Sequence, residues 1–289
     1  MDFASRFFAG LFVGAMLFPQ GSVAQGTASG QVMLGYLDNT SLTTGYVFGD
    51  FTLSLHGETY GVDVGMFGVV GRLHETYAAL TWKQGANVLE FGFPRPAYDR
   101  FAPSALTQLM PRLALENIGA SRSRATDGTM TEPDFLPYGA VYRLQNKTSQ
   151  IAMSLHGVPD YDVTVFGAGG RMARGDWLLD VGVEAVAQYG DLDWNAKAQL
   201  RNERDWGTFG VGVFDANAND AGLTAEIFVL AQVGDDFSLS GVLRYTDDTD
   251  AQLGLGASYD IGRGISAAVA VVDGQSDAVS VDASVAFSF

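Results

Sequence analysis

The C-terminal stretch Val279-Ser280-Val281-Asp282-Ala283-Ser284-Val285-Ala286-Phe287-Ser288-Phe289 decides the fold class of this chain. Its odd positions are apolar, and its even positions are small or polar. Because successive side chains of a β-strand point to opposite faces, this period of two predicts a strand with one apolar and one polar face. The same alternation recurs at 177–185, 194–201 and 251–260, so the chain is predicted to be all-β.

The alternating segments follow one another closely enough to predict an antiparallel array of about 16 strands. Each predicted strand has about 9–11 residues, which is the length that crosses a bilayer at a tilt of about 45°. Short turns rich in Gly and Asp separate the strands, for example at 189–191 and 262–264.

One segment, 43–57, is ambiguous, because its alternation changes phase between Tyr46/Phe48 and Phe51/Leu53. The intervening Gly49-Asp50 is either a β-bulge within one strand or a tight turn between two strands. A turn would raise the count to 17, whereas bacterial barrels of a single chain have even numbers of strands. We therefore predict one bulged strand.

The composition excludes several classes of protein. The chain has 289 residues, with 17 Lys and Arg against 33 Asp and Glu, so its formal net charge is −16. A nucleic-acid partner is excluded, because binding one needs a basic surface for the phosphates. The sequence has no Cys, which excludes disulfide scaffolds and thiolate metal sites. Hydrophobic residues make up 47% of the chain, which argues against disorder.

Residues 1–24 have the three parts of a secretory signal peptide. Arg6 lies near the start, the segment 7–18 is apolar, and Ser22-Val23-Ala24 supplies small residues for cleavage. The apolar run is too short to span the hydrocarbon core as a helix, which needs about 20 residues. We predict that 1–24 is removed after export and that 25–289 forms a single domain.

A soluble β-sandwich would also show alternation, but two features favour a membrane barrel. The polar face carries ionisable groups on strand after strand, as expected for the lining of a water-filled lumen. Aromatic residues recur at the ends of the apolar faces, where membrane barrels have interfacial girdles. These residues are Trp177, Tyr189, Trp194, Tyr245, Tyr259 and Phe289. The predicted fold is therefore a transmembrane antiparallel β-barrel with its apolar face outward.

One long segment, 94–136, interrupts the strands after the fifth. Six of the eight prolines lie in it or at its edge: Pro94, Pro96, Pro103, Pro111, Pro133 and Pro137. It could be an exposed surface loop, but Leu109, Met110, Leu113 and Leu115 would then lack a wall to pack on. We predict that it folds into the lumen. Ser104 could cap a short helix over 105–115, with Pro111 limiting its regularity.

Three features resemble the Gram-negative general porins, which are trimeric 16-stranded channels. The chain ends in Val285-Ala286-Phe287-Ser288-Phe289, similar to the terminal-Phe signature of that family. The segments 77–82, 87–93 and 95–99 resemble the family's fourth strand, fifth strand and entry to the constriction loop. The long loop also follows the fifth strand, as it does in porins. The loop entry departs from the family, because Gly92-Phe93-Pro94-Arg95 stands where Gly-Arg-Gln is common.

The resemblance implies passive diffusion of small hydrophilic solutes across the outer membrane of a Gram-negative bacterium. It also implies a homotrimer embedded in outer-membrane lipid, and recognition of Phe289 by the barrel assembly machinery. In such a pore, acidic groups of the loop face basic groups of the wall. The acidic candidates are Asp99, Asp127, Glu132 and Asp134, and the basic candidates are Arg143, Lys197, Arg201 and Arg244, with Lys83 as a further one.

The inward-facing acids outnumber these bases, which predicts a weak preference for cations. The acids are Asp63, Glu90, Asp180, Glu184, Glu226, Asp260 and Asp282.

Three other possibilities follow from the residues. The tetrapeptides Ser54-Leu55-His56-Gly57 and Ser154-Leu155-His156-Gly157 would place Ser–His pairs in the lumen of a barrel hydrolase. We do not expect an enzyme, since nothing in the sequence brings a nucleophile, a base and an orienting group together. A channel selective for one ligand is the second possibility. We expect no cofactor, although Asp247, Asp248 and Asp250 could bind Ca²⁺ through carboxylate oxygens.

Overall fold

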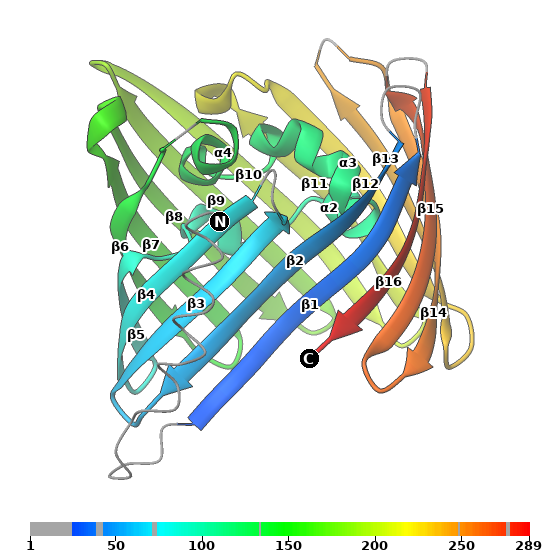
Figure 1. Ribbon diagram of the computed structural model, residues 1–289, viewed down its shortest axis with the longest axis horizontal. Helices are drawn as coiled ribbons and strands as arrows, with labels where there is room; N and C mark the ends of the chain where they lie inside the picture. The colour runs from blue at the N-terminus through cyan, green and yellow to red at the C-terminus, as the bar shows by residue number, and fades with distance from the viewer. Residues whose placement is uncertain (1–24, 39–42, 71–73, 133, 248, 276–277) are drawn as a thin grey trace.

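The computed structural model describes residues 25–38, 43–70, 74–132, 134–247, 249–275 and 278–289. These residues form a closed antiparallel barrel with a helical segment inside it (Figure 1). The signal peptide predicted for 1–24 lies outside the described residues.

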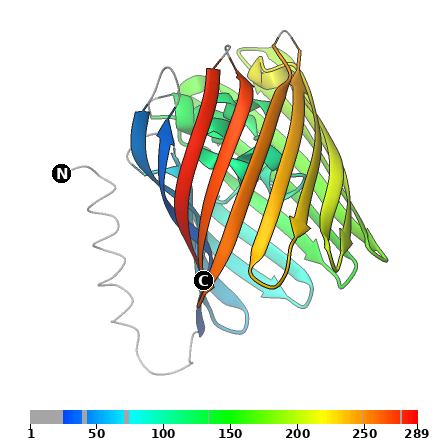
Figure 2. The ribbon, with the colours of Figure 1, turned by 90° about the vertical axis from the view of Figure 1, so that its right-hand side faces the viewer.

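Each strand pairs with its neighbours in the sequence, and β1 pairs with β16 to close the barrel. The described part of the chain contains the 16 predicted strands. They are β1 (Gln25–Asp38), β2 (Thr43–His56), β3 (Tyr60–Val69), β4 (His74–Gln84), β5 (Asn87–Phe93), β6 (Tyr138–Gln145), β7 (Ser149–Val158), β8 (Val163–Arg174), β9 (Trp177–Gln188), β10 (Asp191–Arg204), β11 (Gly207–Ala216), β12 (Leu223–Gln232), β13 (Phe237–Thr246), β14 (Gln252–Gly262), β15 (Ile265–Gln275) and β16 (Ala278–Ser288). Figure 2 shows the strong common tilt of these strands.

The outward faces of the strands are apolar, as the alternation predicts. On β7, for example, Ile151, Met153 and Leu155 are exposed on the outer surface, whereas Ala152, Ser154 and His156 point inward and are buried. An apolar outer face is what a barrel needs against lipid. In the described residues, no helix has the length and apolarity to span a membrane.

The ambiguous segment 43–57 is a single strand, as predicted, but the expected bulge is wrong. The pairing of β2 with β1 and with β3 runs without a register shift. Tyr46 and Phe48 are buried on the inward face, and Leu53 and Leu55 are exposed on the outward face. The direction of the side chains therefore never changes phase. The sequence misled us because part of the inward face is apolar, where it meets the helices in the lumen.

The long loop folds into the barrel, as predicted, and contacts the wall on several sides (Figure 1). Its elements are η1 (Tyr98–Arg100), α2 (Ala105–Leu109), α3 (Pro111–Ala114), η2 (Leu115–Ala120) and α4 (Arg124–Thr131). η1 contacts β7, β8 and β9, α2 contacts β13 and β14, and α3 contacts β2 and β3. η2 contacts β11, and α4 contacts β4. The loop therefore crosses the lumen rather than lining one side of it.

An apolar cluster inside the barrel holds the middle of the loop and Met130 of α4 to the wall; we call it the lumen core. The loop supplies Leu106, Met110, Leu113, Leu115, Ile118 and Met130, among others, and the wall supplies Met33, Leu37, Tyr46, Phe48, Phe67, Val272 and their neighbours. Beside it, Leu109 packs on β14, where a Cβ atom at Gly254 or Gly256 would lie 2.5 Å from its methyl carbons. Glycine at these two positions gives α2 room to approach the wall.

The predicted helix over 105–115 is broken in two at Pro111, which is the first residue of α3. A proline has no N–H to donate and ends a helix that precedes it. Ser104 is the residue before α2, but its side chain makes no capping bond to that helix. Its hydroxyl instead donates to a carboxylate of the barrel wall, at Glu226.

Candidate pore constriction

The predicted acidic residue Asp99 lies in η1 and is buried inside the loop itself. Its carboxylate accepts hydrogen bonds from the Ser123 backbone N–H at 2.7 Å and from the Thr126 hydroxyl. Its backbone carbonyl accepts a long bond from Arg122 at 3.4 Å. Asp99 thus fastens the start of the loop to the N-terminus of α4.

The other three predicted acids lie at the end of the loop. Glu132 pairs with Arg124, and Asp127 lies 3.8 Å from the same guanidinium. Burial raises the pKa of the Asp127 carboxyl to about 6, and the Arg124 charge opposes that rise. Asp134 is exposed, with a left-handed backbone at φ 59°. Asp127 and Glu132 therefore contact an arginine of the loop rather than a base of the wall.

Three of the predicted bases pair with carboxylates on neighbouring strands of the wall. Arg143 of β6 donates to Glu90 of β5 at 2.7 Å. Arg201 of β10 lies 3.0 Å from Asp180 of β9, which also pairs with Arg171.

Arg244 of β13 completes this set and lies 3.7 Å from Glu226 of β12. Arg244 directly faces Glu226 in the ladder, whereas the other two pairs are diagonal, displaced by two residues. Both arrangements bring long side chains of adjacent strands within reach of each other. These pairs therefore follow from the register of the strands, and each neutralises an acid that was counted toward cation preference.

The two lysines lie apart from those pairs. Lys197 is buried under the loop, where its ammonium donates to the Ser121 carbonyl at 2.9 Å and lies 4.1 Å from the centre of the Tyr98 ring. Lys83 contacts the Nδ1 atom of His56. The predicted acidic and basic sets are thus all inside the barrel or at its mouth, but the structure pairs neither with the other.

Wall carboxylates that the sequence placed in the open lumen instead bind the loop. Glu226 accepts from the Ser104 hydroxyl at 2.6 Å and from the Ala105 N–H at 2.7 Å, at the start of α2. Glu184 accepts from the Ser123 hydroxyl and from the Arg124 N–H at 2.8 Å, at the start of α4. Helix N-termini have free N–H groups and attract negative charge, so these two glutamates act as caps.

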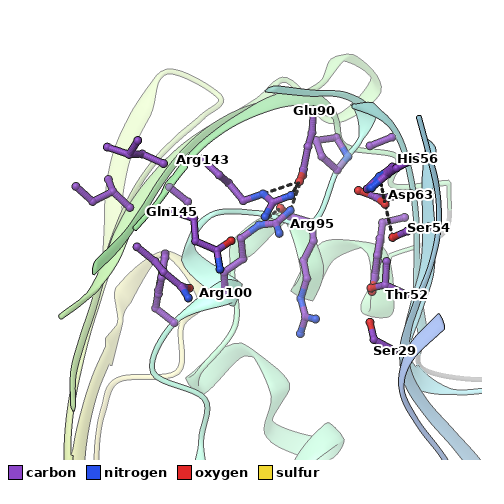
Figure 3. Close-up of a pocket in the computed structure, with 18 residues that line it drawn as sticks. Ser29, Thr52, Ser54, His56, Asp63, Glu90, Arg95, Arg100, Arg143 and Gln145 are labelled. Carbon is purple, nitrogen blue, oxygen red and sulfur yellow. Dashed lines mark hydrogen bonds and ion pairs between the residues drawn. The ribbon is translucent and has the colours of Figure 1, made fainter. Parts of the chain in front are cut away.

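A polar cavity of about 390 Å³ remains between the loop and the wall, from β1 to β7 (Figure 3). Arg143 and Gln145 lie on one side of it, and Thr52, Ser54, His56 and Asp63 lie on the other. Arg95 and Arg100 enter it from the loop. This polar space beside the loop is the candidate constriction.

Sequence reasoning missed the roles of Arg95 and Arg100. Arg100 shares Glu90 with Arg143, and Arg95 lies 3.3 Å from Asp50 of β2. A signal was available, because Arg95 stands in the segment 95–99 that resembles the entry of a constriction loop. The resemblance implies acids on the loop, whereas the loop also supplies these two arginines.

The Ser–His pairs point into the barrel, as the alternation predicted, but each member has another partner. Ser54 donates to Asp63, and His56 Nε2 lies 2.8 Å from that same carboxylate. His156 is fully buried with its Nε2 atom 3.0 Å from the Pro94 carbonyl, and the Ser154 hydroxyl accepts from the Ala97 N–H. No serine–histidine hydrogen bond joins either described pair.

The possible Ca²⁺ site remains a prediction. Asp247 and Asp250 lie in the turn between β13 and β14, and Asp248 lies outside the described residues. The described residues contain no group of three or more His, Asp or Glu side chains placed to hold a metal ion.

These features define a class of architecture: a closed 16-stranded antiparallel barrel whose loop after the fifth strand folds into the lumen, as in porins. A triple mutant of the porin from Rhodopseudomonas blastica has this fold, with a TM-score of 0.70 and 15% identity over 92% of this chain and 100% of that one. Another triple mutant of this porin has a TM-score of 0.69 and 14% identity, again over 92% of this chain and 100% of that one. A solved structure titled asymmetric conductivity of engineered proteins has a TM-score of 0.66 and 14% identity, over 92% of this chain and 100% of that one. No protein-family model and no curated protein matches the chain.

Proposed function

We propose that this protein is an outer-membrane pore for the passive diffusion of small hydrophilic solutes and ions. The observation that carries the proposal is the polar cavity between the loop and the wall of a closed barrel, lined by charged and hydroxyl groups. A wide barrel narrowed by an internal segment selects solutes by size and by the charges around the opening. The porin fold of the solved structures supports the same function.

Export by the signal peptide, residence in a Gram-negative outer membrane and assembly as a homotrimer belong to this proposal. So does insertion by the barrel assembly machinery through Phe289. The support for them is the porin-like fold, the apolar outer surface and the aromatic C-terminal residue. The absence of an enzymatic role is also part of the proposal. It is supported by the serines and histidines in the lumen, which bind neighbouring groups instead of each other.

A weak preference for cations is part of the proposal. The wall acids are largely engaged by arginines and by the loop. The remaining support is the excess of acids in the turns at the end of the barrel from which the loop departs. Reversal potentials in a salt gradient would measure the preference, and anion selectivity would contradict it.

Single-channel conductance of the refolded protein in planar bilayers tests the proposed function. We expect ohmic channels, with closure in three steps if the protein is a trimer of open pores. Complete absence of conductance from protein whose circular dichroism shows a folded barrel would contradict the pore.

A further inference from the structure

We propose that the cavity between Arg95, Arg100 and Arg143 is a saturable binding site for small hydroxylated carboxylates, such as sugar acids. The inference rests on the proposed pore, because it names a solute class that would pause in the same space. It goes beyond free diffusion, because a bound solute occupies a defined site.

The positive side of the site has more guanidinium groups than carboxylates to neutralise them. Arg143 Nε donates to Glu90 at 2.7 Å, and Arg100 pairs with the other oxygen of the same carboxylate. Glu90 is 3% exposed and carries one negative charge, so this group of three residues keeps one positive charge. The bonds to Glu90 use only some of the N–H groups of the two guanidinium groups.

Arg95 adds unused donor capacity at the same cavity. Its Nη1 atom reaches Asp50 only at 3.3 Å, and its Nε atom is buried with no hydrogen-bond partner among the described residues. The single long bond to Asp50 leaves most of the N–H groups of Arg95 without a side-chain acceptor. Guanidinium groups match carboxylates well, because two parallel N–H groups can meet two oxygens.

The facing side of the cavity is rich in hydroxyl groups, and its one lining carboxylate, Asp63, is held by Ser54 and lies 2.8 Å from His56 Nε2. Ser29, Thr52 and Ser54 line it from β1 and β2 (Figure 3). Tyr77 donates to the Phe51 carbonyl, so Thr52 Oγ1 donates to the Tyr77 hydroxyl at 2.7 Å, and Ser54 donates to Asp63. The Thr52 and Ser54 oxygens can therefore accept from a solute hydroxyl. A solute with a carboxylate at one end and hydroxyls along its body fits both sides.

The size of the cavity suits such a molecule. Its volume of about 390 Å³ lies within the range of about 300–1,000 Å³ that small-molecule sites occupy. A neutral sugar would leave the guanidinium donors unmatched, and a short acid such as acetate would leave the hydroxyl side unmatched. The site therefore predicts an order of binding in which gluconate exceeds acetate and both exceed glucose.

Block of single-channel conductance by added solute tests the site. At about 0.1 M KCl, where charges more than about 10 Å apart are largely screened, we expect gluconate to reduce conductance saturably. Glucose at the same concentrations should leave it unchanged, and acetate should act only at higher concentration.

Arg143→Gln and Arg100→Gln should each raise the half-blocking concentration of gluconate about tenfold, the effect of losing one charge-assisted hydrogen bond. In either variant Glu90 keeps one guanidinium partner, so no buried carboxylate is left unpaired. Arg204→Gln is the matched control. Arg204 is half exposed, pairs with Asp176 and is not among the residues that line the cavity, so block should be unaffected.

Calorimetry of gluconate binding to the protein in detergent separates this inference from the proposed function. Channels that conduct but show no gluconate binding, or binding equal in Arg143→Gln and wild type, would overturn the site and leave the pore intact. Protein that binds gluconate through Arg143 but forms no channel would refute the pore instead.

Discussion

At the scale of single residues, two buried carboxylates of the wall bind the loop, although their alternation predicted that they line the open lumen. Glu226 and Glu184 point inward, as predicted, but both accept hydrogen bonds from the backbone at the starts of α2 and α4. A carboxylate at a helix N-terminus satisfies free N–H groups and is stabilised by the helix dipole. Counting inward acids therefore overestimates the negative charge available to a permeating ion.

We predict that Glu226→Ala destabilises the protein by about 3–5 kcal/mol, the usual cost of breaking a buried ion pair. The change removes the acceptor of Ser104 and Ala105 and leaves Arg244, which is 3% exposed, without its carboxylate. Urea-induced unfolding in detergent micelles measures the loss.

Glu226→Gln is the control for the shape of the side chain. It keeps an acceptor oxygen for α2 but no charge for Arg244, so its cost should be smaller, about 1–3 kcal/mol. If the alanine and glutamine variants unfold at the same urea concentration as wild type, Glu226 does not anchor the loop.

At the scale of elements, the loop is held by two kinds of contact. Its middle part packs in the lumen core, and its backbone is tied to the wall by Asp180, Glu184 and Glu226. The strands need neither, because each strand is already hydrogen-bonded on both sides in the closed ladder. The loop should therefore be able to detach while the barrel stays folded.

Met110→Asp tests this separation. Met110 is fully buried in the lumen core, and an unpaired charge there would cost several kcal/mol. We expect the loop to leave the wall, single-channel conductance to increase, and the loop to become sensitive to protease, while circular dichroism still reports the β-barrel.

Gln108→Asp introduces the same charge two residues away, at an exposed position of α2. It should leave conductance and protease resistance close to wild type. An unchanged conductance in Met110→Asp, together with an intact loop, would contradict the role of the lumen core.

At the scale of the whole molecule, the negative charge is unevenly distributed between the two ends of the barrel. The end from which the loop departs has acids in its turns, namely Asp160, Asp162, Asp220, Asp247 and Asp250, and no Lys or Arg in the described turn residues between β7 and β14. The opposite end has five acids in its described turns, Glu58, Asp176, Asp205, Asp235 and Asp236, but also the bases Lys147 and Arg263. A ring of one sign concentrates counter-ions at a pore mouth.

We predict that changing Asp160, Asp162, Asp220 and Asp247 to Asn moves the reversal potential in a KCl gradient toward zero. The effect should be largest at low ionic strength, because salt screens exposed charges. Asp235→Asn with Asp236→Asn is the control at the opposite end, where Lys147 and Arg263 offset part of the acidic charge. A shift in the control as large as in the fourfold variant would show that the acidic mouth does not set the preference.

Much of the architecture could be predicted from the sequence, because a strand with one apolar face produces a local alternation of apolar and polar residues. The period of two in 279–289 and its repeats gave the strand class, the outward face and the count of 16. The prolines and apolar residues of 94–136 likewise predicted a segment that leaves the ladder and packs on a wall. These properties depend on neighbours in the sequence.

The site could be predicted only in part, because charge pairing depends on which strands and loops meet. The sequence identified Arg143 and Glu90 as inward-facing, but only the register of β5 with β6 brings them together. Tyr46 and Phe48 suggested a change in the alternation because they are apolar on an inward face. They are apolar because they pack against the helices of the loop, which the sequence does not place there.

The sequence by itself determined a chain with alternating faces, an apolar outer surface and one segment excluded from the sheet. The tertiary structure decided which partners the charged side chains have. The closed ladder placed arginines beside acids, and the loop turned wall glutamates into helix caps. The physical reason is that alternation is encoded every two residues, whereas electrostatic partners are set by contacts between residues far apart in the chain. The net charge of −16 therefore describes the surface of the protein better than it describes the lumen.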